Sequence, residues 1–441
     1  MRASGGSLME KIGIEHVPLN SRHGKTSQLF TLWLASNLTI ADYALGFLPV
    51  SLGVPLPYMI VGLLVGNILG SLFLALAVAM GPKMGLPQMF ISRWSFGRKG
   101  NYLFAALNWI STVGWFTVNV ILGTFALQTL LPSMPLIVGA AITVVVEVLL
   151  AIFGYDIIHG FEKVMAILLG GLFAFTSLII VVQHYAAISS YSPKSVGGSG
   201  LAILAITLAA AFSYVMSWSP YGSDYSRYLA EKTPYRTSIL NSFLGAFIGS
   251  LWLEIIGAFV AIIAPTASNS ISALPTAFGI LGLPIVVAIM LGGVAANVLN
   301  IYTNALSALV LDIKTKRWIV VVIGGCVGLL LAVYGAANFG RFYEQFLLLL
   351  DYWITPWLGI IAVDFFVLKR ISFSNMSSIP GFSWRAIASY LIGVLVSIAF
   401  IPSIGYLGFT GPVARLIGGA DFSYFVSFLV AVALYYLLSR R

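Results

Sequence analysis

Apolar stretches of about twenty residues follow one another along almost the whole chain, and the few charged residues fall between them. The chain is 59% hydrophobic and 8% charged, whereas an ordinary soluble domain carries about 25% charged residues. No soluble fold could bury that much apolar surface. The sequence therefore predicts an all-α polytopic membrane protein.

A helix needs about 20 apolar residues to cross roughly 30 Å of hydrocarbon, and this length predicts twelve spans. We expect them near residues 27–51, 57–80, 101–131, 134–154, 158–183, 201–221, 237–264, 284–311, 318–335, 342–368, 385–408 and 420–439. Residues 1–26 are polar and lack the apolar core of a signal peptide, so they are expected to form a cytoplasmic N-terminal tail that stays in the mature protein.

Lysines and arginines gather in alternate loops between these spans, and Lys194, Arg341 and Arg415 are the exceptions. Cytoplasmic loops accumulate Lys and Arg. We therefore expect both termini in the cytoplasm and the protein in the plasma or inner membrane. The net charge of +9 then reflects membrane topology rather than binding of nucleic acid.

Two predicted spans contain residues that disfavour a continuous helix. In the first span, residues 36–42 carry several hydrogen-bonding side chains, and Gly46 follows. In the sixth, residues 217–223 include Pro220 and Gly222, and in a regular helix Pro and Gly cost about 3 and about 1 kcal/mol relative to Ala. Simple kinks in packed helices are the alternative interpretation.

The two interruptions lie five spans apart, and an odd offset reverses the direction of a helix in the membrane. This arrangement predicts an inverted 5+5 repeat in which broken spans 1 and 6 form a binding site at the midplane. The expected repeats cover residues 27–183 and 201–368, and residues 385–439 add two further helices.

Carboxylates at bilayer depth are expensive to bury and are therefore functional candidates. Asp42 lies in the first interruption and is the strongest candidate, both for substrate binding and for coupling to an ion. Glu147 and Glu254 have apolar sequence neighbours, which favours buried packing acids. Asp351 and Asp364 lie nearer to the ends of a span.

Polar and aromatic side chains also gather in the third and eighth spans. Trp115 and Asn119 are four residues apart and share one helical face, where an indole plane beside an amide would suit a flat ligand with hydrogen-bonding edges. The polar side chains of the eighth span are Asn297, Asn300, Tyr302, Thr303 and Asn304. Such a density suggests a lined cavity, although amides can also hold membrane helices together.

The sequence lacks the common motifs of an enzyme active site. The sequence has no glycine-rich phosphate loop and no HExxH motif, and its four histidines are scattered. Cys326 is the single cysteine, so we expect neither a disulfide nor a cysteine-based metal site within one chain and interpret it as a packing residue. We predict that the protein is not an enzyme and has no cofactor and no metal centre.

Five short motifs occur in order along the chain: Trp33–Asn37, Gly85–Gly97, Trp115–Asn119, Ser223–Tyr228 and Asp364–Arg370. Together they resemble the nucleobase-cation symporters of the purine and cytosine permease type, which share the LeuT-like fold. The resemblance runs from about residue 14 to about residue 372.

The resemblance implies roles for several residues. In that family the tryptophan of the third span stacks on the substrate ring and the amide one turn later bonds its edge, which here implies Trp115 and Asn119. An asparagine of the eighth span matches Asn300. A tryptophan of the sixth span covers the opposite face of the substrate, and Trp218 is the nearest match.

The register of the sixth span stays open, because another spacing would select Val215 beside Tyr214. Tyr214 and Ser217 are therefore further candidates for substrate binding. Sodium-coupled relatives place Ser or Thr hydroxyls on the eighth span, where this chain has Val294 and Ala295. This departure favours H⁺ as the coupling ion over Na⁺, with Asp42 as its site.

We therefore predict a secondary transporter that imports cytosine or a purine with a cation, most simply a proton, by alternating access. A sodium-coupled transporter of allantoin, hydantoin, uracil or a thiamine-related pyrimidine is the alternative. A channel or an integral membrane enzyme is the alternative from another class, but the polar residues form local clusters rather than a continuous stripe. The expected partners are the small-molecule nucleobase and the lipid bilayer, with no nucleic acid and a monomer as the functional unit.

Overall fold

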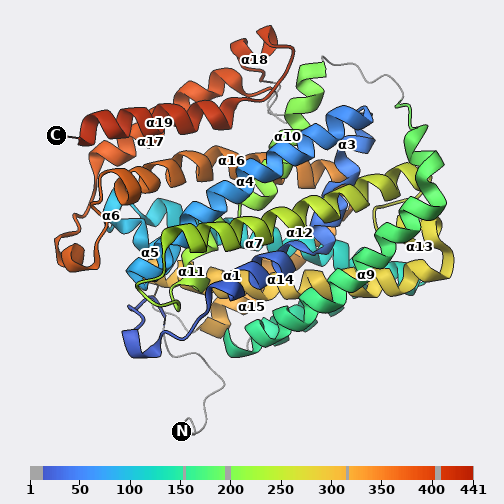
Figure 1. Cartoon of the computed structure of the whole chain (residues 1–441), viewed down its shortest axis with the longest axis horizontal. Coiled ribbons are helices and arrows are strands. Elements are labelled where there is room, and N and C mark those ends of the chain that lie inside the picture. The colour runs from blue at the N-terminus through green and yellow to red at the C-terminus, as the bar shows by residue number, and fades with distance from the viewer. Residues whose placement is uncertain (1–12, 152–154, 194–199, 314–316, 403–408, 441) are drawn as a thin grey trace, which may run out of the picture.

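The computed structural model describes residues 13–151, 155–193, 200–313, 317–402 and 409–440 (Figure 1). These residues are helical, and the extended contacts among them amount to one isolated bridge between Gly24 and Leu229. The helices confirm the predicted twelve-span architecture. Residues 152–154 and 403–408, which the predicted fourth and eleventh spans include, fall outside the described residues.

The first and sixth spans consist of short consecutive helices. The first contains α1 (Thr26–Asn37), α2 (Ile40–Leu45) and α3 (Phe47–Ser51). The sixth contains α10 (Gly200–Met216), the 3₁₀ turn η2 (Ser219–Tyr221) and α11 (Gly222–Ser226). The other spans are α4 (Leu56–Met84), α7 (Tyr102–Leu130), α8 (Leu136–Ala151), α9 (Tyr155–Ser189), α12 (Tyr235–Ile263), α14 (Gly282–Val310), α15 (Arg317–Gly335), α16 (Phe339–Ala362), α17 (Trp384–Ser397) and α19 (Ser423–Ser439).

Short helices and turns connect these spans. They are η1 (Leu19–Ser21), α5 (Gln88–Ile91), α6 (Arg93–Phe96), α13 (Ala273–Phe278), η3 (Gly279–Leu281), η4 (Ala336–Asn338), the π-helical turn η5 (Val363–Val367), η6 (Phe373–Ser378), η7 (Ile398–Phe400) and α18 (Pro412–Leu416).

The spans pack in two groups related by the order of the repeat. The broken first span, α4, the broken sixth span and α12 contact one another, and α7, α8, α14 and α15 form the second group. Helix α9 bridges the groups through α1, α12 and α14, and α16 packs against α10 and α7. Helices α17 and α19 pack against each other along one side of the bundle (Figure 1). Spans 1, 2, 6 and 7 thus share one group and spans 3, 4, 8 and 9 share the other, as an inverted repeat predicts, whereas α9 and α16, the fifth spans of the two repeats, belong to neither group.

Close contact between α4 and α10 depends on three glycines spaced four residues apart. A Cβ on Gly62 would meet Thr207, one on Gly66 would meet the carbonyl oxygen of Leu208, and one on Gly70 would meet that of Phe212. Small residues at this spacing let membrane helices approach closely. These three glycines let the sixth span pack closely against α4, and this contact fixes the depth of its interruption within the bundle.

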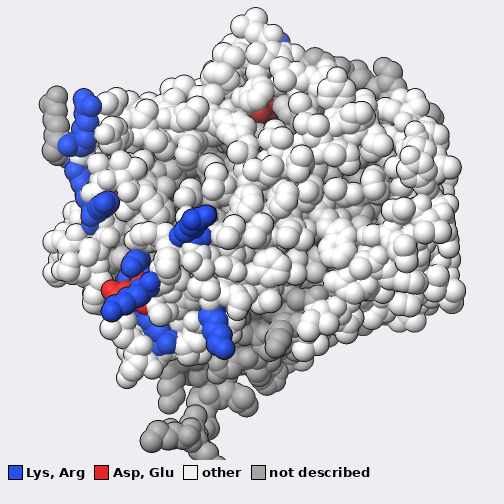
Figure 2. All heavy atoms as spheres, viewed as in Figure 1, with Lys and Arg blue, Asp and Glu red and all other residues white. Residues whose placement is uncertain are grey.

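Basic side chains gather at one end of the bundle, the end that carries α5, α6 and α11, and most of the remaining surface in view is uncharged (Figure 2). The C-terminus of α19 lies at the same end (Figure 1). Cys326 is exposed on the surface of the bundle, so its interpretation as an internal packing residue was wrong. An apolar helix surface that faces lipid has the same composition as one that faces a core, which is why the sequence did not distinguish them.

Candidate functional site

The chain leaves the helical conformation in the middle of the first span. Helix α1 ends at Asn37, Leu38 and Thr39 adopt non-helical angles (ψ 60° and 163°), and α2 begins at Ile40. The Thr39 side chain accepts a hydrogen bond from the backbone N–H of Asp42 at 3.4 Å and pairs with the Tyr214 hydroxyl at 2.9 Å. The first predicted interruption is confirmed, and a threonine cap joins it to the sixth span.

The sixth span is interrupted at a matching position. Helix α10 ends at Met216, and a turn through Ser217 and Trp218 leads into η2. The Ser217 hydroxyl donates to the Tyr214 carbonyl at 2.6 Å, so it satisfies an acceptor that the end of the helix leaves free. The second predicted interruption is therefore confirmed as well.

Aromatic rings surround Trp115 on α7. Its ring lies edge-on to Tyr214 of α10 and to Phe346 of α16, at 5.2 Å between centroids in both cases, and 6.2 Å from Tyr343. The Trp115 side chain is buried at 6% exposure. Helices from both packing groups thus meet around one indole ring.

Trp218 belongs to a different cluster. Its Nε1–H donates to Asn37 Oδ1 at 3.2 Å, and its ring contacts Trp33 at 5.8 Å and Tyr221 at 5.3 Å. Among the described ring contacts, the α10 aromatic that touches Trp115 is Tyr214. The structure therefore brings Trp115 and Tyr214 together and places Trp218 against the end of α1.

Three asparagines and a glutamate form a buried network between α7, α8 and α14, called here the amide network. Asn297 Nδ2 donates to Glu147 Oε2 at 2.6 Å, and Asn297 Oδ1 accepts from both Asn119 Nδ2 and Asn300 Nδ2 at 2.9 Å. Oδ1 of Asn119 and Oδ1 of Asn300 are buried without a hydrogen-bond partner in the described part of the chain. Two carbonyl acceptors of the network, one of them a helical turn from Trp115, thus have no hydrogen-bond partner in the described structure and suit the N–H donors of a ligand.

Asp42 lies against α12. The Ser250 hydroxyl donates to Asp42 Oδ1 at 2.5 Å, and Glu254 lies one helical turn beyond Ser250. The carboxylate is therefore oriented toward the seventh span at the point where α2 begins.

The α14 segment that the family resemblance compared with sodium ligands also lies at the first interruption. A Cβ on Gly292 of α14 would meet the Leu38 carbonyl at 2.6 Å, so α14 touches the non-helical residues directly. Val294 and Ala295 follow and are buried at 8% and 1% exposure. Their side chains offer no oxygen to a hard cation, which prefers oxygen ligands.

A cavity of about 800 Å³ opens at the end of the bundle opposite the basic loops. Phe47, Asn269, Arg341 and Tyr343 contribute to its lining. Tyr343 also contacts Trp115, and its hydroxyl donates to the Ala41 carbonyl at 3.1 Å. This side chain therefore separates the cavity from the residues around the interruption.

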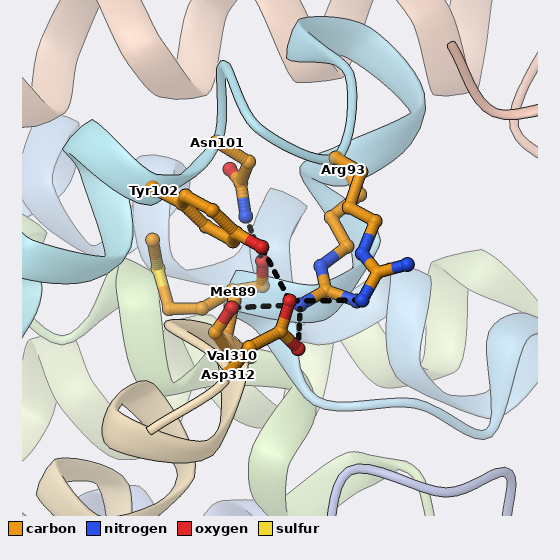
Figure 3. A network of polar contacts seen from close by, with 7 residues as sticks. Met89, Arg93, Asn101, Tyr102, Val310 and Asp312 are labelled. Atoms are coloured by element: carbon orange, nitrogen blue, oxygen red, sulfur yellow. Dashed lines mark hydrogen bonds and ion pairs between the residues drawn. The ribbon is translucent and has the colours of Figure 1, made fainter. Parts of the chain in front are cut away.

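At the basic end, Asp312 follows α14 and collects donors from α6 and α7 (Figure 3). Its carboxylate lies 3.0 Å from Arg98 and 3.4 Å from Arg93, and it accepts from the Tyr102 hydroxyl, while Arg93 also donates to the Val310 carbonyl at 2.7 Å. Partial burial would raise the pKa of Asp312, but the hydrogen bonds from Tyr102 and Arg98 and the charges of the two arginines outweigh it, so the pKa is lowered.

Two of the motifs that carry the family resemblance meet next to this network. Asp224 of α11 accepts from the Gln88 backbone N–H at 2.9 Å and from the Thr303 hydroxyl at 2.7 Å. The Ser223 hydroxyl donates to Gln88 Oε1 at 2.6 Å. These motif residues join α5, α11 and α14, and Thr303 lies one helical turn from Asn300 of the amide network along α14.

The partners of several site residues were not predicted from the sequence. Glu147 and Glu254 were interpreted as packing acids because their sequence neighbours are apolar, yet their spatial neighbours are amides and a hydroxyl. Asn297 and Asn300 were both named among the polar residues that suggest a lined cavity, and their three-residue spacing places them on one helical face. Ser250 and Glu254 share a face of α12 at four-residue spacing in the same way.

Two interrupted helices that meet at the centre of an inverted repeat define a membrane transporter of the LeuT-like type. Residues 16–427 match the sequence profile of the permeases for cytosine/purines, uracil, thiamine and allantoin, and the chain belongs to this family. It is therefore a permease and not an enzyme.

Relatives cover nearly the whole chain. The putative purine-cytosine permease YxlA of Bacillus subtilis is 29% identical over 98% of this chain and 96% of its own length. The purine-cytosine permease fcyB of Emericella nidulans is 26% identical over 97% and 87%. The solved structure of Mhp1, a nucleobase-cation-symport-1 family transporter in a closed conformation with bromovinylhydantoin bound, superposes with a TM-score of 0.77 at 17% identity, covering 98% of this chain and 96% of Mhp1. That similarity supports the fold.

Proposed function

We propose that this permease imports cytosine or a purine together with a proton, by alternating access to a site between the two interrupted spans. The amide network beside Trp115 carries the proposal. It holds two buried carbonyl oxygens without hydrogen-bond partners in the described structure, and Asn119, which carries one of them, lies one helical turn from Trp115. A flat heterocycle with N–H groups requires such acceptors together with an aromatic plane. The names of the purine-cytosine permeases among the relatives support the same substrate class.

In this proposal Trp115 stacks on the base, and Asn119 and Asn300 accept hydrogen bonds from its edge. Tyr214 serves as the second aromatic residue of the site. The Ser217 hydroxyl fixes its position by donating a hydrogen bond to the Tyr214 carbonyl. Trp218 is proposed to contribute when the interrupted helices move, since it contacts Asn37 directly before the first interruption.

A proton is the proposed coupling ion, with Asp42 as its site. Two observations support it: Val294 and Ala295 lack the hydroxyls that a sodium ion would use, and Asp42 is fully buried in the membrane without a cationic partner among the described ion pairs. We further propose that both termini lie in the cytoplasm, that the protein resides in the cell membrane, and that the monomer is the functional unit.

A binding panel on purified protein tests the substrate class. Radiolabelled cytosine is bound, and unlabelled adenine, hypoxanthine, uracil, allantoin and pyridoxine compete. Pyridoxine is included because a vitamin B6 transporter of Saccharomyces cerevisiae is 24% identical over 82% of this chain. Saturable cytosine binding displaced best by a purine supports the proposal. Absence of saturable binding, or displacement best by allantoin, uracil or pyridoxine, contradicts it.

A further inference from the structure

One serine hydroxyl lies between two carboxylates that come from different helices. The Ser250 hydroxyl of α12 is 2.5 Å from Asp42 Oδ1 of α2 and 3.4 Å from Glu254 Oε1. Asn67 of α4 donates through Nδ2 to Glu254 Oε2 at 2.5 Å. All four side chains are fully buried in the structure. Asp42, Ser250, Glu254 and Asn67 are called here the carboxylate pair site.

Close packing of the backbones creates this arrangement. A Cβ on Gly46 would collide with the Glu254 carbonyl, and a Cβ on Gly257 would collide with the Tyr43 carbonyl. These two glycines allow the first span to contact α12 directly. The close approach places the buried Asp42 side chain beside Ser250 of α12.

The carboxylate pair site has more buried acceptor oxygens than hydrogens donated to them. Ser250 has one hydroxyl hydrogen, which it gives to one acceptor at a time. Asp42 Oδ2 and Asn67 Oδ1 are buried and lack partners within the described structure. Among the described residues the ion pairs all involve Asp312, so no cation neutralises Asp42 or Glu254.

The neighbouring helices supply neutral groups. Tyr214 of α10 and Tyr343 of α16 are the titratable side chains that face the pair. The Tyr214 hydroxyl pairs with Thr39 and also interacts with the Asp42 side chain, and the Tyr343 hydroxyl donates to the Ala41 carbonyl. Two buried like charges close together disfavour double ionisation, and one bound proton removes one of the two charges.

We propose that Glu254 shares the coupling proton with Asp42 and that the Ser250 hydroxyl passes it between them. With the proton on Glu254 Oε1, this O–H donates to Ser250 Oγ, and Ser250 donates to Asp42 Oδ1. Transfer breaks the O–H bond of Glu254, forms one on Ser250 and moves the original serine hydrogen to Asp42. The net charge of the pair stays at −1 throughout, and no other reactant is needed.

The location of Asp42 links this relay to the proposed substrate site. The Asp42 backbone N–H bonds to Thr39, and the Thr39 hydroxyl pairs with Tyr214, whose ring contacts Trp115 at 5.2 Å. A change in the charge of Asp42 therefore acts on the helix start and the tyrosine that border the base. The inference rests on the proposed proton symport and adds Glu254 and Ser250 to it.

The test compares accumulation with exchange in proteoliposomes that contain the full-length protein. Labelled cytosine is the probe, and labelled adenine is the second probe. Accumulation is driven by an inward proton gradient, whereas exchange against internal unlabelled base requires no net proton movement. Glu254→Gln keeps an acceptor for Asn67 but cannot carry the proton. We expect accumulation to fall at least tenfold and to lose its pH dependence, while exchange stays within twofold of the wild type.

Asp351→Asn is the matched control, because Asp351 is another fully buried membrane carboxylate and lies on α16 outside the carboxylate pair site. It should keep both activities. Ser250→Ala keeps both acids and removes the bridge, and it should show the same selective loss. This variant decides the result if the Glu254 variant does not fold.

The outcomes separate the two proposals. A wild type that binds base but shows no proton-driven accumulation contradicts the proposed symport itself. A proton-coupled wild type with unchanged accumulation in Glu254→Gln and Ser250→Ala overturns the relay alone. Equal loss of exchange and accumulation in both variants also overturns it, because the acids then serve binding or folding rather than coupling.

Discussion

The two unpaired amide oxygens give a prediction that separates substrate binding from folding. Asn119→Leu or Asn300→Leu removes one acceptor of the proposed base. A ligand N–H left without its partner costs about 1–3 kcal/mol, which corresponds to a roughly 5- to 150-fold increase in Kd. Each single variant should weaken binding of cytosine or adenine within this range.

The structure also predicts that these variants fold. Asn297 Oδ1 accepts from both Asn119 and Asn300. Removal of either donor leaves the other in place, so no acceptor of the amide network is stranded. Asn297→Leu differs, because it removes the partner of Glu147 as well as the acceptor for both amides, and each stranded buried group costs about 1–3 kcal/mol. That variant should lose thermal stability.

The assay is equilibrium binding of labelled base to purified protein, with thermal unfolding measured on the same samples. Asn304→Leu is the control, since Asn304 lies one turn further along α14 and donates to Thr112 at 2.6 Å rather than to the amide network. It should lower stability without changing Kd. Unchanged Kd in both Asn119→Leu and Asn300→Leu would refute the reasoning and would leave the network as a contact between helices.

Two further predictions concern the aromatic ring and the basic end. Trp115→Ala should weaken base binding at least tenfold, because stacking of a base on an aromatic side chain is worth about 1–3 kcal/mol. Trp115→Phe should retain more of the affinity. If both variants bind the base as tightly as the wild type, Trp115 is not part of the site. Asp312→Asn should lower thermal stability at pH 7 but not in acid: a lowered carboxyl pKa stabilises the fold above the unfolded value of about 3.9 and loses this effect as pH falls through the folded value. A stability difference that is the same at both pH values would show that charge on Asp312 is irrelevant.

Much of the architecture follows from local sequence. Apolar runs of sufficient length predict the spans, and Pro220, Gly222 and the polar residues after Ser36 weaken the helices where the structure interrupts them. The bounds differ by a few residues, because fraying, capping and short 3₁₀ turns depend on neighbouring helices. Beyond Ser397 the eleventh span, for example, continues as the 3₁₀ turn η7 rather than as α-helix.

The site could be predicted in part. Trp115, Asn119 and Asn300 stand out as polar or aromatic residues at helical spacing in apolar spans. The role of Glu147 could not be predicted, since its partner Asn297 is 150 residues away in sequence. The same holds for Asp42 and Glu254, which meet because Gly46 and Gly257 let two helices touch. Such pairings depend on tertiary packing that no local pattern encodes.

Proton-driven uptake in proteoliposomes tests the central claim most directly. Purified protein is reconstituted in sodium-free buffer with a pH-sensitive dye inside the vesicles, and labelled cytosine or adenine is added outside. The account predicts that the base accumulates, that the lumen acidifies with uptake, and that a protonophore abolishes accumulation. Accumulation that requires sodium and resists the protonophore would contradict it.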